Sequence, residues 1–472
     1  MSLTRQIAHN TITQLIGKII STLLGLITIG LMTRYLGVEK FGWYITTISF
    51  LQFIGIMTDF GTIVVTAQMM SEPFHDKNKL FKNIFTFRFA SAFIFFAAAP
   101  AIALALPYPP QVKIAILIAS LSFFTTEINQ VFVGLFQTKL KMHLYAVAEV
   151  ISKILLTIGV WVMVKIDAGF LPIIGAILFS SLAQTFLIWQ KAKREIEIGF
   201  SFDLNVWKDI MKKMWPIALS IVFNVIYLKG DLVLLSIYTT QANVGLYGAA
   251  YRVLDVITQS AMMIMGTLMP LLAFAWSHKQ KDEFKKHYQQ SFDIMMLFAI
   301  PMMFGTIALS RKIMQFIAGA DFISSEKILS ILAIAVFGVF LGAVFGHTAV
   351  AINRQKETLW IYISNAVITL VGYLIFIPAY GMLGAAWMSV FSELYAGILL
   401  FFTINHYSKE KIHFKTTFKI IFASIVMSST IALFPRVHVL ISIILGILVY
   451  GAVILLTKTI SQKTLKEIFS RN

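Results

Sequence analysis

The sequence contains no cysteine, and only 13% of its 472 residues are charged. Without thiols the chain forms no disulfide framework and no thiolate metal site. It also lacks a phosphate-binding P-loop, an HExxH zinc motif and any arrangement that resembles a catalytic triad. These absences argue against a directly ATP-driven pump. They favour a protein that is not an enzyme and needs no bound cofactor or metal.

Apolar residues are abundant instead, at 58% of the chain, and the mean hydropathy is +0.81. A soluble domain has about 45–50% apolar and about 25% charged residues. About fourteen apolar segments reach the roughly 20 residues needed to cross a bilayer. The first runs from about Ile12 to Met32, longer than a signal-peptide core, so we expect a permanent span. The predicted fold class is an all-α polytopic membrane protein with about 14 transmembrane helices.

The formal net charge of +17 is explained by where the basic residues lie. One set of alternate connections holds about 26 Lys and Arg residues, and the other set holds about 8. By the positive-inside rule the first set is cytoplasmic, which puts both termini inside the cell. We therefore expect a multi-pass protein of the cell (inner or cytoplasmic) membrane and no nucleic-acid partner.

The longest connection between spans is basic and has apolar residues at helical spacing, namely Trp207, Ile210, Met211 and Met214. This pattern predicts an amphipathic helix on the membrane surface that joins two halves. The predicted organisation is an N-terminal lobe of six spans (1–190), the linker (191–213), a C-terminal lobe of six spans (214–404), two extra helices (417–456) and a cytoplasmic tail (457–472).

An internal repeat supports two halves. The segment YLGVEKFGWY (35–44) aligns without gaps on YTTQANVGLY (238–247), at an offset of 203 residues. Each segment is an outward-facing turn that opens a half of about six helices. The repeat predicts two pseudo-symmetric six-helix bundles related by an axis normal to the membrane.

Four ionisable residues lie inside apolar helices near the second copy of the repeat: Lys229, Asp231, Arg252 and Asp255. A charge at that depth costs roughly 2.5–3.5 kcal/mol on insertion scales, so it usually faces protein or a watery cavity. Arg252 and Asp255 are three residues apart and share a helix face, so a structural ion pair is the alternative. Lys229 and Asp231 are two apart and face different directions. We interpret Lys229 and Arg252 as candidate substrate-binding cations.

Three further basic residues lie within predicted helices. Lys18 fits either a cavity role or snorkelling to the cytoplasmic surface. Arg88 lies near the cytoplasmic start of its helix, where snorkelling is favoured. Lys153 follows Glu149 by four residues, in the orientation that favours a helical ion pair. All three are predicted as additional candidates for substrate binding.

The acidic residues bear on energy coupling. Asp59, Glu127 and Glu393 have no opposite charge three or four residues away on their own helix. Low dielectric disfavours a lone carboxylate charge, so such groups are candidates to bind a proton or Na⁺. With Asp231 and Asp255 they form the predicted ion-coupling or gating set.

Three blocks carry a family resemblance: RYLGVEKFGWY (34–44) followed by TDFG (58–61), KGDLVLLSIYTTQANVGLYGAAYRVLD (229–255) and GMLGAAWMSVFSELYAG (381–397). The chain resembles the polysaccharide (O-antigen-type) flippases of the multidrug/oligosaccharidyl-lipid/polysaccharide exporter superfamily. The resemblance implies that helices 1–6 rock against helices 7–12 around a cationic cavity suited to the phosphate of a polyprenyl-linked glycan lipid.

The resemblance also implies that helices 13–14 help to form a groove for the lipid tail, that other glycan-assembly proteins are partners alongside membrane lipids, and that the chain is a monomer. Two alternatives from the same superfamily stay open. A multidrug or cation antiporter usually has twelve helices and an acidic cavity, whereas a lipid-II flippase also has fourteen helices and a basic one. A glycan polymerase or a membrane scaffold is the reading from a different class. A polymerase would favour large extramembrane loops, which this sequence lacks.

Overall fold

The structure is a computed structural model that describes residues 3–58, 61–72 and 76–459, and every regular element in these ranges is a helix. Hydrocarbon offers no hydrogen-bond partners, so a spanning segment must satisfy its backbone internally. Eleven helices are long and apolar enough to span a membrane. Two of them contain two spans each, and the helix Leu204–Tyr238 adds one more. The predicted all-α fold with about fourteen spans is confirmed.

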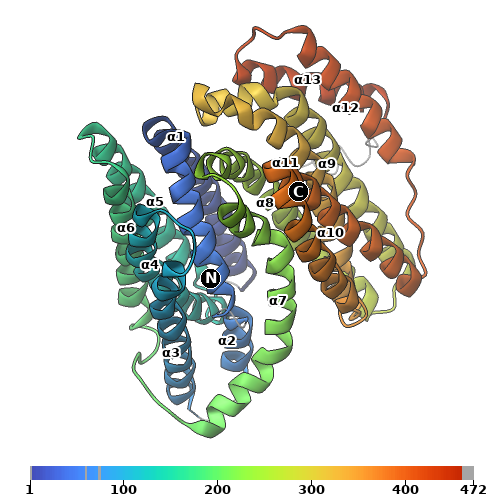
Figure 1. Cartoon of the computed structure of the whole chain (residues 1–472). Coiled ribbons are helices and arrows are strands. Elements are labelled where there is room, and N and C mark those ends of the chain that lie inside the picture. The colour runs from blue at the N-terminus through green and yellow to red at the C-terminus, as the bar shows by residue number, and fades with distance from the viewer. Residues whose placement is uncertain (1–2, 59–60, 73–75, 460–472) are drawn as a thin grey trace. The chain divides into compact units, whose positions relative to one another are not determined.

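The first compact unit, Met1–Gly245, has an apolar core to which α2, α3, α4, α5, α6 and the start of α7 contribute. Figure 1 shows α3 to α6 as neighbouring blue-to-teal helices, and α7 in green. The helices that begin in this unit are α1 (Leu3–Ile56), α2 (Thr62–Ser71), α3 (Lys77–Leu104), α4 (Pro110–Thr138), α5 (Met142–Lys165), α6 (Phe170–Ala192), α7 (Leu204–Tyr238) and α8 (Gln241–Ser277).

The second unit, Leu246–Asn472, contains most of α8 and all later helices. In it α10 packs against α9 and α11, and α12 packs against α9 and α13. A small apolar cluster of Leu309, Met427 and Ile431 joins α9 to α12. The remaining elements are α9 (Lys281–Ile317), η1 (Ala320–Ser325), α10 (Glu326–Ala351), α11 (Leu359–Ser408), α12 (Lys415–Leu433) and α13 (Val439–Leu456).

Two glycines divide the longest helices into hairpins. Gly37 in α1 has φ +66°, and Gly381 in α11 has φ +56°. A side chain disfavours this left-handed region, and only glycine adopts it without a steric penalty. The chain therefore turns within one or two residues, and two membrane spans follow each other almost without a loop.

The predicted linker helix differs from the structure. Residues 197–203 have no regular secondary structure, and a helix begins only at Leu204, where the Asp203 carboxylate accepts a hydrogen bond from the Asn205 backbone N–H at 3.0 Å. Such a side chain satisfies one of the unpaired N–H groups at a helix start. From there α7 is continuous to Tyr238, so the amphipathic turns belong to a spanning helix.

The helical spacing of the linker residues is correct, although their surroundings differ from the prediction. Ile210 and Met214 are buried in the core of the first unit instead of lying on a membrane surface. The division into lobes at 190 and 213, and the pseudo-symmetry of the two bundles, stay predictions.

Candidate functional site

A buried ion pair connects α3 and α4. Arg88 is 1% exposed, and its guanidinium bonds the Glu127 carboxylate and, at 3.3 Å, the Glu127 carbonyl oxygen. The expectation that Arg88 snorkels to the surface is wrong, because its side chain is enclosed by protein. Glu127 also has an opposite charge, supplied by a neighbouring helix 39 residues away in sequence. Spacing within one helix gives no sign of such a partner. The charges of the two residues balance each other. This ion pair would have to break before either residue could bind a substrate or an ion.

The other predicted charges of the first unit lie in α1, α5 and α7. Lys18 and Lys153 are both half-buried, on α1 and α5. In α7 Lys229 is half-buried, whereas Asp231 is fully buried and its carboxylate accepts a hydrogen bond from the Leu232 N–H at 2.7 Å. The expectation that Lys229 and Asp231 face different directions agrees with this difference in burial. Asp59 lies outside the described residues.

The two copies of the repeat contact each other within the first unit. A Cβ added to Gly42 would collide with the carbonyl of Gln241, and one added to Gly245 would collide with the carbonyl of Val38. Gly42 corresponds to Gly245, and Val38 to Gln241, at the repeat offset of 203 residues, so the contact is reciprocal. Reciprocal contacts of this kind are what a two-fold axis produces. The α1 turn and the first turn of α8 therefore meet backbone to backbone.

Hydrogen bonds surround this glycine contact. The Thr46 hydroxyl donates to the Gln241 side-chain oxygen at 2.6 Å. The hydroxyls of Tyr108 and Ser236 lie 2.9 Å apart and link the connection between α3 and α4 to the end of α7. Sequence reasoning identified the repeat but did not predict that its two copies touch.

In the second unit Arg252 and Asp255 form the ion pair that the sequence left open as the alternative, and the substrate-binding role of Arg252 stays a prediction. The guanidinium and carboxylate are 3.5 Å apart on α8, and their side chains are 20% and 30% exposed. Glu393 is half-buried on α11, where the Gly338 backbone of α10 packs closely against its main chain. Glu393 is therefore held at a fixed depth by a helix crossing.

A buried hydroxyl cluster of the second unit was not predicted. The Ser389 hydroxyl lies 3.2 Å from the Tyr247 hydroxyl and 3.1 Å from the Tyr373 hydroxyl. These residues come from α8 and from both halves of α11. The one sign of this cluster in the sequence is Tyr247, the last residue in the second copy of the repeat.

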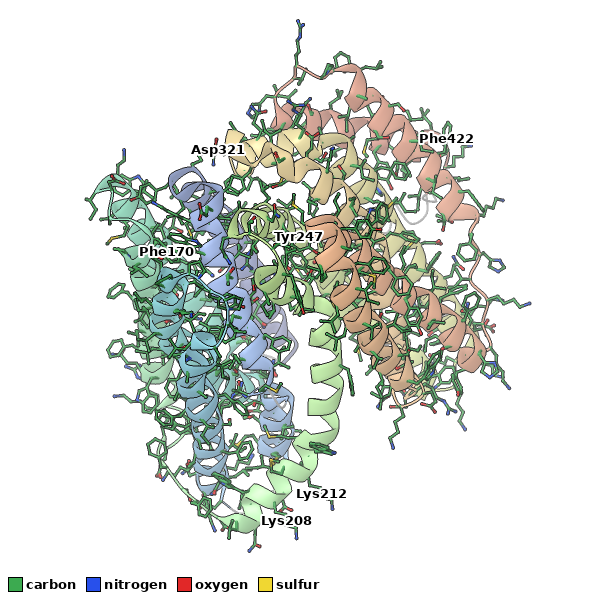
Figure 2. All side chains as sticks on the ribbon, in the orientation of Figure 1. Phe170, Lys208, Lys212, Tyr247, Asp321 and Phe422 are labelled. Carbon is green, nitrogen blue, oxygen red and sulfur yellow. The ribbon has the colours of Figure 1, made fainter. Side chains whose placement is uncertain are left out.

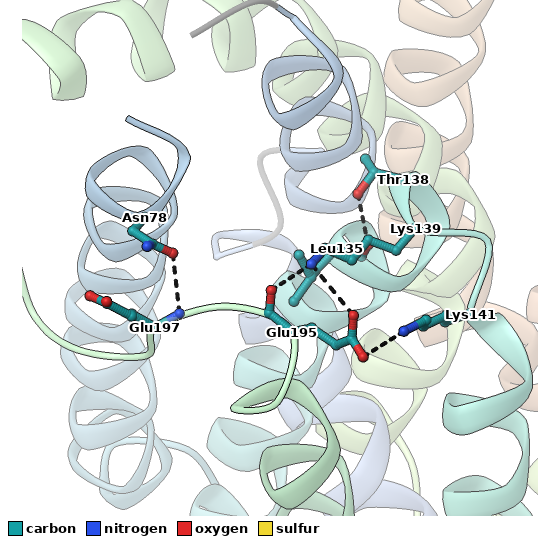
Figure 3. Close-up of polar contacts among 7 residues, drawn as sticks. All are labelled: Asn78, Leu135, Thr138, Lys139, Lys141, Glu195 and Glu197. Atoms are coloured by element: carbon teal, nitrogen blue, oxygen red, sulfur yellow. Dashed lines mark hydrogen bonds and ion pairs between the residues drawn. The ribbon is translucent and has the colours of Figure 1, made fainter. Parts of the chain in front are cut away.

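A polar network fastens the connection between α6 and α7 (Figure 3). Lys141 bonds the Glu195 carboxylate at 2.6 Å, and Lys139 bonds the Glu195 carbonyl oxygen. The Asn78 side chain accepts a hydrogen bond from the Glu197 backbone N–H at 3.2 Å. The hydrogen bond from Lys141 lowers the pKa of Glu195, and the charges of Lys141 and Lys139 add to this effect. In the sequence these lysines indicate only which side of the membrane is cytoplasmic. In the structure they also bind the segment that connects α6 to α7.

Within the described ranges, no group of three His, Asp or Glu residues is placed to hold a metal ion. Arg88 and Arg252 are in ion pairs, Lys18, Lys153, Lys229 and Glu393 are half-buried, and Asp231 is fully buried with a hydrogen bond from the backbone.

The class of protein follows from the fold. The structure of the lipid II flippase MurJ in an inward closed conformation superposes with a TM-score of 0.78 and 19% identity, over 95% of this chain and 99% of that one. An inward-facing multidrug resistance MATE family transporter superposes with a TM-score of 0.67 and 15% identity, over 84% and 98%. The chain is a multi-pass membrane protein with a transporter-like fold.

The family is set by sequence. Residues 31–325 match the model of the polysaccharide biosynthesis protein family, and the chain belongs to that family. It is also 25% identical over 246 residues to a protein of Haloferax volcanii named as the probable low-salt glycan biosynthesis flippase Agl15. That match covers 50% of this chain and 52% of the relative, so the chain spans about half the length of the curated relative it matches. The predicted resemblance to polysaccharide flippases is confirmed.

Proposed function

We propose that this protein carries a polyprenyl-(di)phosphate-linked oligosaccharide from the cytoplasmic to the outer leaflet by alternating access. The observation that carries the proposal is the presence of Lys229 and Arg252 inside apolar helices of a polysaccharide biosynthesis protein. An anionic headgroup that crosses roughly 30 Å of hydrocarbon needs cations to replace its hydration. The relative named as a glycan biosynthesis flippase supports the same substrate class.

The two arginines, Arg252 and Arg88, suit different roles in this proposal. Arg252 is 20% exposed and its Asp255 partner is 3.5 Å away, at the long end for a charge-assisted bond. A phosphate oxygen can approach such a guanidinium without stranding a buried carboxylate. Arg88 is enclosed and bound to Glu127, so phosphate binding there would leave a buried carboxylate unpaired, which is costly. We assign substrate binding to Arg252 and Lys229, and a conformational role to the Arg88–Glu127 pair.

Ion coupling is the second part of the proposal. Asp231, Asp255 and Glu393 are carboxylates within helices of the two units, and H⁺ or Na⁺ is the proposed ion. The protein would act in the cytoplasmic membrane as a monomer with both termini inside, alongside other glycan-assembly proteins. The basic connections on one side of the helices support this orientation.

The alternatives are a lipid-II flippase and a multidrug or cation antiporter. The likeness to the lipid II flippase extends over 95% of this chain, whereas the MATE transporter matches 84%. Fold likeness at 19% and 15% identity does not carry the substrate, so the alternatives are decided by transport measurements.

The test is reconstitution of the purified chain in liposomes with a labelled polyprenyl-diphosphate oligosaccharide, whose exposure is followed with an impermeant quencher. Arg252→Ala and Lys229→Ala should each slow flipping at least roughly tenfold, the cost of one charge-assisted bond. Arg436→Ala, at an exposed site in the α12–α13 loop, is the matched control. Undiminished flipping in both test variants would refute the cationic pathway. Faster transport of lipid II or of a cationic dye would support an alternative.

A further inference from the structure

The first three turns of α7 project beyond the membrane core. The helix has 35 residues, or about 52 Å at 1.5 Å per residue, against roughly 30 Å of hydrocarbon. We call Leu204–Trp215 the α7 start segment. One of its faces is buried, because Val206, Ile210 and Met214 pack into the core of the first unit.

The opposite face of the α7 start segment is uncovered and amphipathic. Leu204 is 70% exposed, Met211 42% and Trp215 61%. Spacings of seven and eleven residues place the three on one stripe. Lys208 and Lys212 are exposed beside this stripe, and Figure 2 shows both directed away from the α7 ribbon.

The segment is held firmly on its buried side. Lys213 bonds the Glu72 carboxylate at 2.6 Å, which joins α7 to the residue that follows α2. Lys79 of α3 pairs with Asp203, the capping residue of α7, at 2.7 Å. The exposed stripe therefore has a fixed orientation on the first unit.

We propose that this face binds the anionic phospholipids of the bilayer, with acyl chains against the apolar stripe and headgroup phosphates at Lys208 and Lys212. Three observations favour this occupant. The segment continues into a spanning helix, which places it at the membrane surface. An apolar stripe bordered by lysines is the pattern of an interfacial helix. A free phosphate ion would satisfy the lysines but leave Leu204 and Trp215 in water. Lipid bound here fixes the start of α7, and this requires no particular transport substrate.

The chain has no cysteine, so a single introduced thiol can be labelled without background. Asn205→Cys is an exposed position on the same segment and would carry a bimane fluorophore. The full chain is placed in phosphatidylcholine nanodiscs containing a small fraction of headgroup-nitroxide phosphatidylglycerol or phosphatidylcholine. We expect stronger quenching by the anionic lipid, and this preference should fall roughly fivefold for each lysine removed in Lys208→Gln and Lys212→Gln.

The matched control is Lys285→Gln with Lys286→Gln, which removes the same charge from exposed positions of α9 and should preserve the preference. Trp215→Ser is expected to weaken quenching by both lipids, because it removes the apolar anchor. Equal quenching by the two lipids in the unaltered chain would overturn the proposal. So would a loss of preference of the same size in the control. Competition by polyprenyl phosphate without any effect of phosphatidylglycerol would also overturn it, since it would assign the face to a substrate lipid.

Discussion

Replacing Gly42 or Gly245 by alanine should open the contact between the two copies of the repeat. An added Cβ on Gly42 would collide with the Gln241 carbonyl oxygen and lie 2.7 Å from its carbon. Carbon atoms pack at about 3.5–4.0 Å, so the two helices must part by roughly 1 Å. A backbone carbonyl cannot rotate away as a side chain can. Overpacking of this kind costs about 1–3 kcal/mol, which changes the ratio of closed to open states by about 5- to 150-fold.

The assay for this prediction uses nitroxides at Lys40→Cys and Thr240→Cys, which are exposed positions beside the contact. Double electron–electron resonance should report one short distance between the two nitroxides when residue 42 is glycine. In Gly42→Ala a larger population should appear at longer distances. Under the proposed function, flipping should slow at the same time, because the arrangement that holds this contact is reached less often.

Gly25→Ala is the control for this prediction, since an added Cβ there meets nothing within 4 Å. Alanine at that helical position should be neutral or slightly stabilising. Identical distance distributions and identical flipping in Gly42→Ala and Gly25→Ala would refute the idea that the glycine contact sets the closed state.

Three further predictions concern the ionisable residues. Arg88→Ala should destabilise the fold by about 3–5 kcal/mol, because it leaves Glu127 buried without its cation, and thermal unfolding should show a smaller loss for Glu127→Gln. Glu393→Gln should flatten the dependence of flipping on pH or Na⁺, and a transport profile that keeps its dependence removes Glu393 from coupling. The lowered pKa of Glu195 stabilises the fold above the ordinary glutamate pKa of about 4.3, and this contribution is lost as pH falls through the lowered value. The melting temperature should therefore drop less between pH 7 and pH 3 in Glu195→Gln than in the unaltered chain, and the two drops should differ by at most a few degrees.

The fold was predictable because hydropathy acts on each span separately. A spanning helix satisfies its own backbone, so composition and length identify it without knowledge of its neighbours. Gly37 and Gly381 give the turns that divide α1 and α11, and their positive φ values need no tertiary information. The start of α7 was harder to place, since amphipathic spacing does not tell whether an apolar face meets lipid or protein.

The site was predictable only where partners lie on one helix. Arg252 and Asp255 are three residues apart, so their pairing follows from helix geometry. Arg88 and Glu127 are 39 residues apart on different helices, and no spacing rule connects them. The same limit hid the cluster of Tyr247, Tyr373 and Ser389, whose members come from separate spans.

The repeat shows where the two halves are alike and where they differ. At the turn the likeness extends to a reciprocal contact of Gly42 and Gly245. The charged residues are not repeated, because the positions equivalent to Lys229 and Arg252 are Leu26 and Ser49. In the first unit Arg88 is enclosed and paired with Glu127, whereas Arg252 of the second unit is 20% exposed and lies 3.5 Å from Asp255. A shared turn needs shared backbone geometry, but phosphate binding needs an available cation. Under the proposed function, phosphate binding is therefore concentrated in Lys229 and Arg252, and the repeat preserves the glycine contact rather than the proposed binding residues.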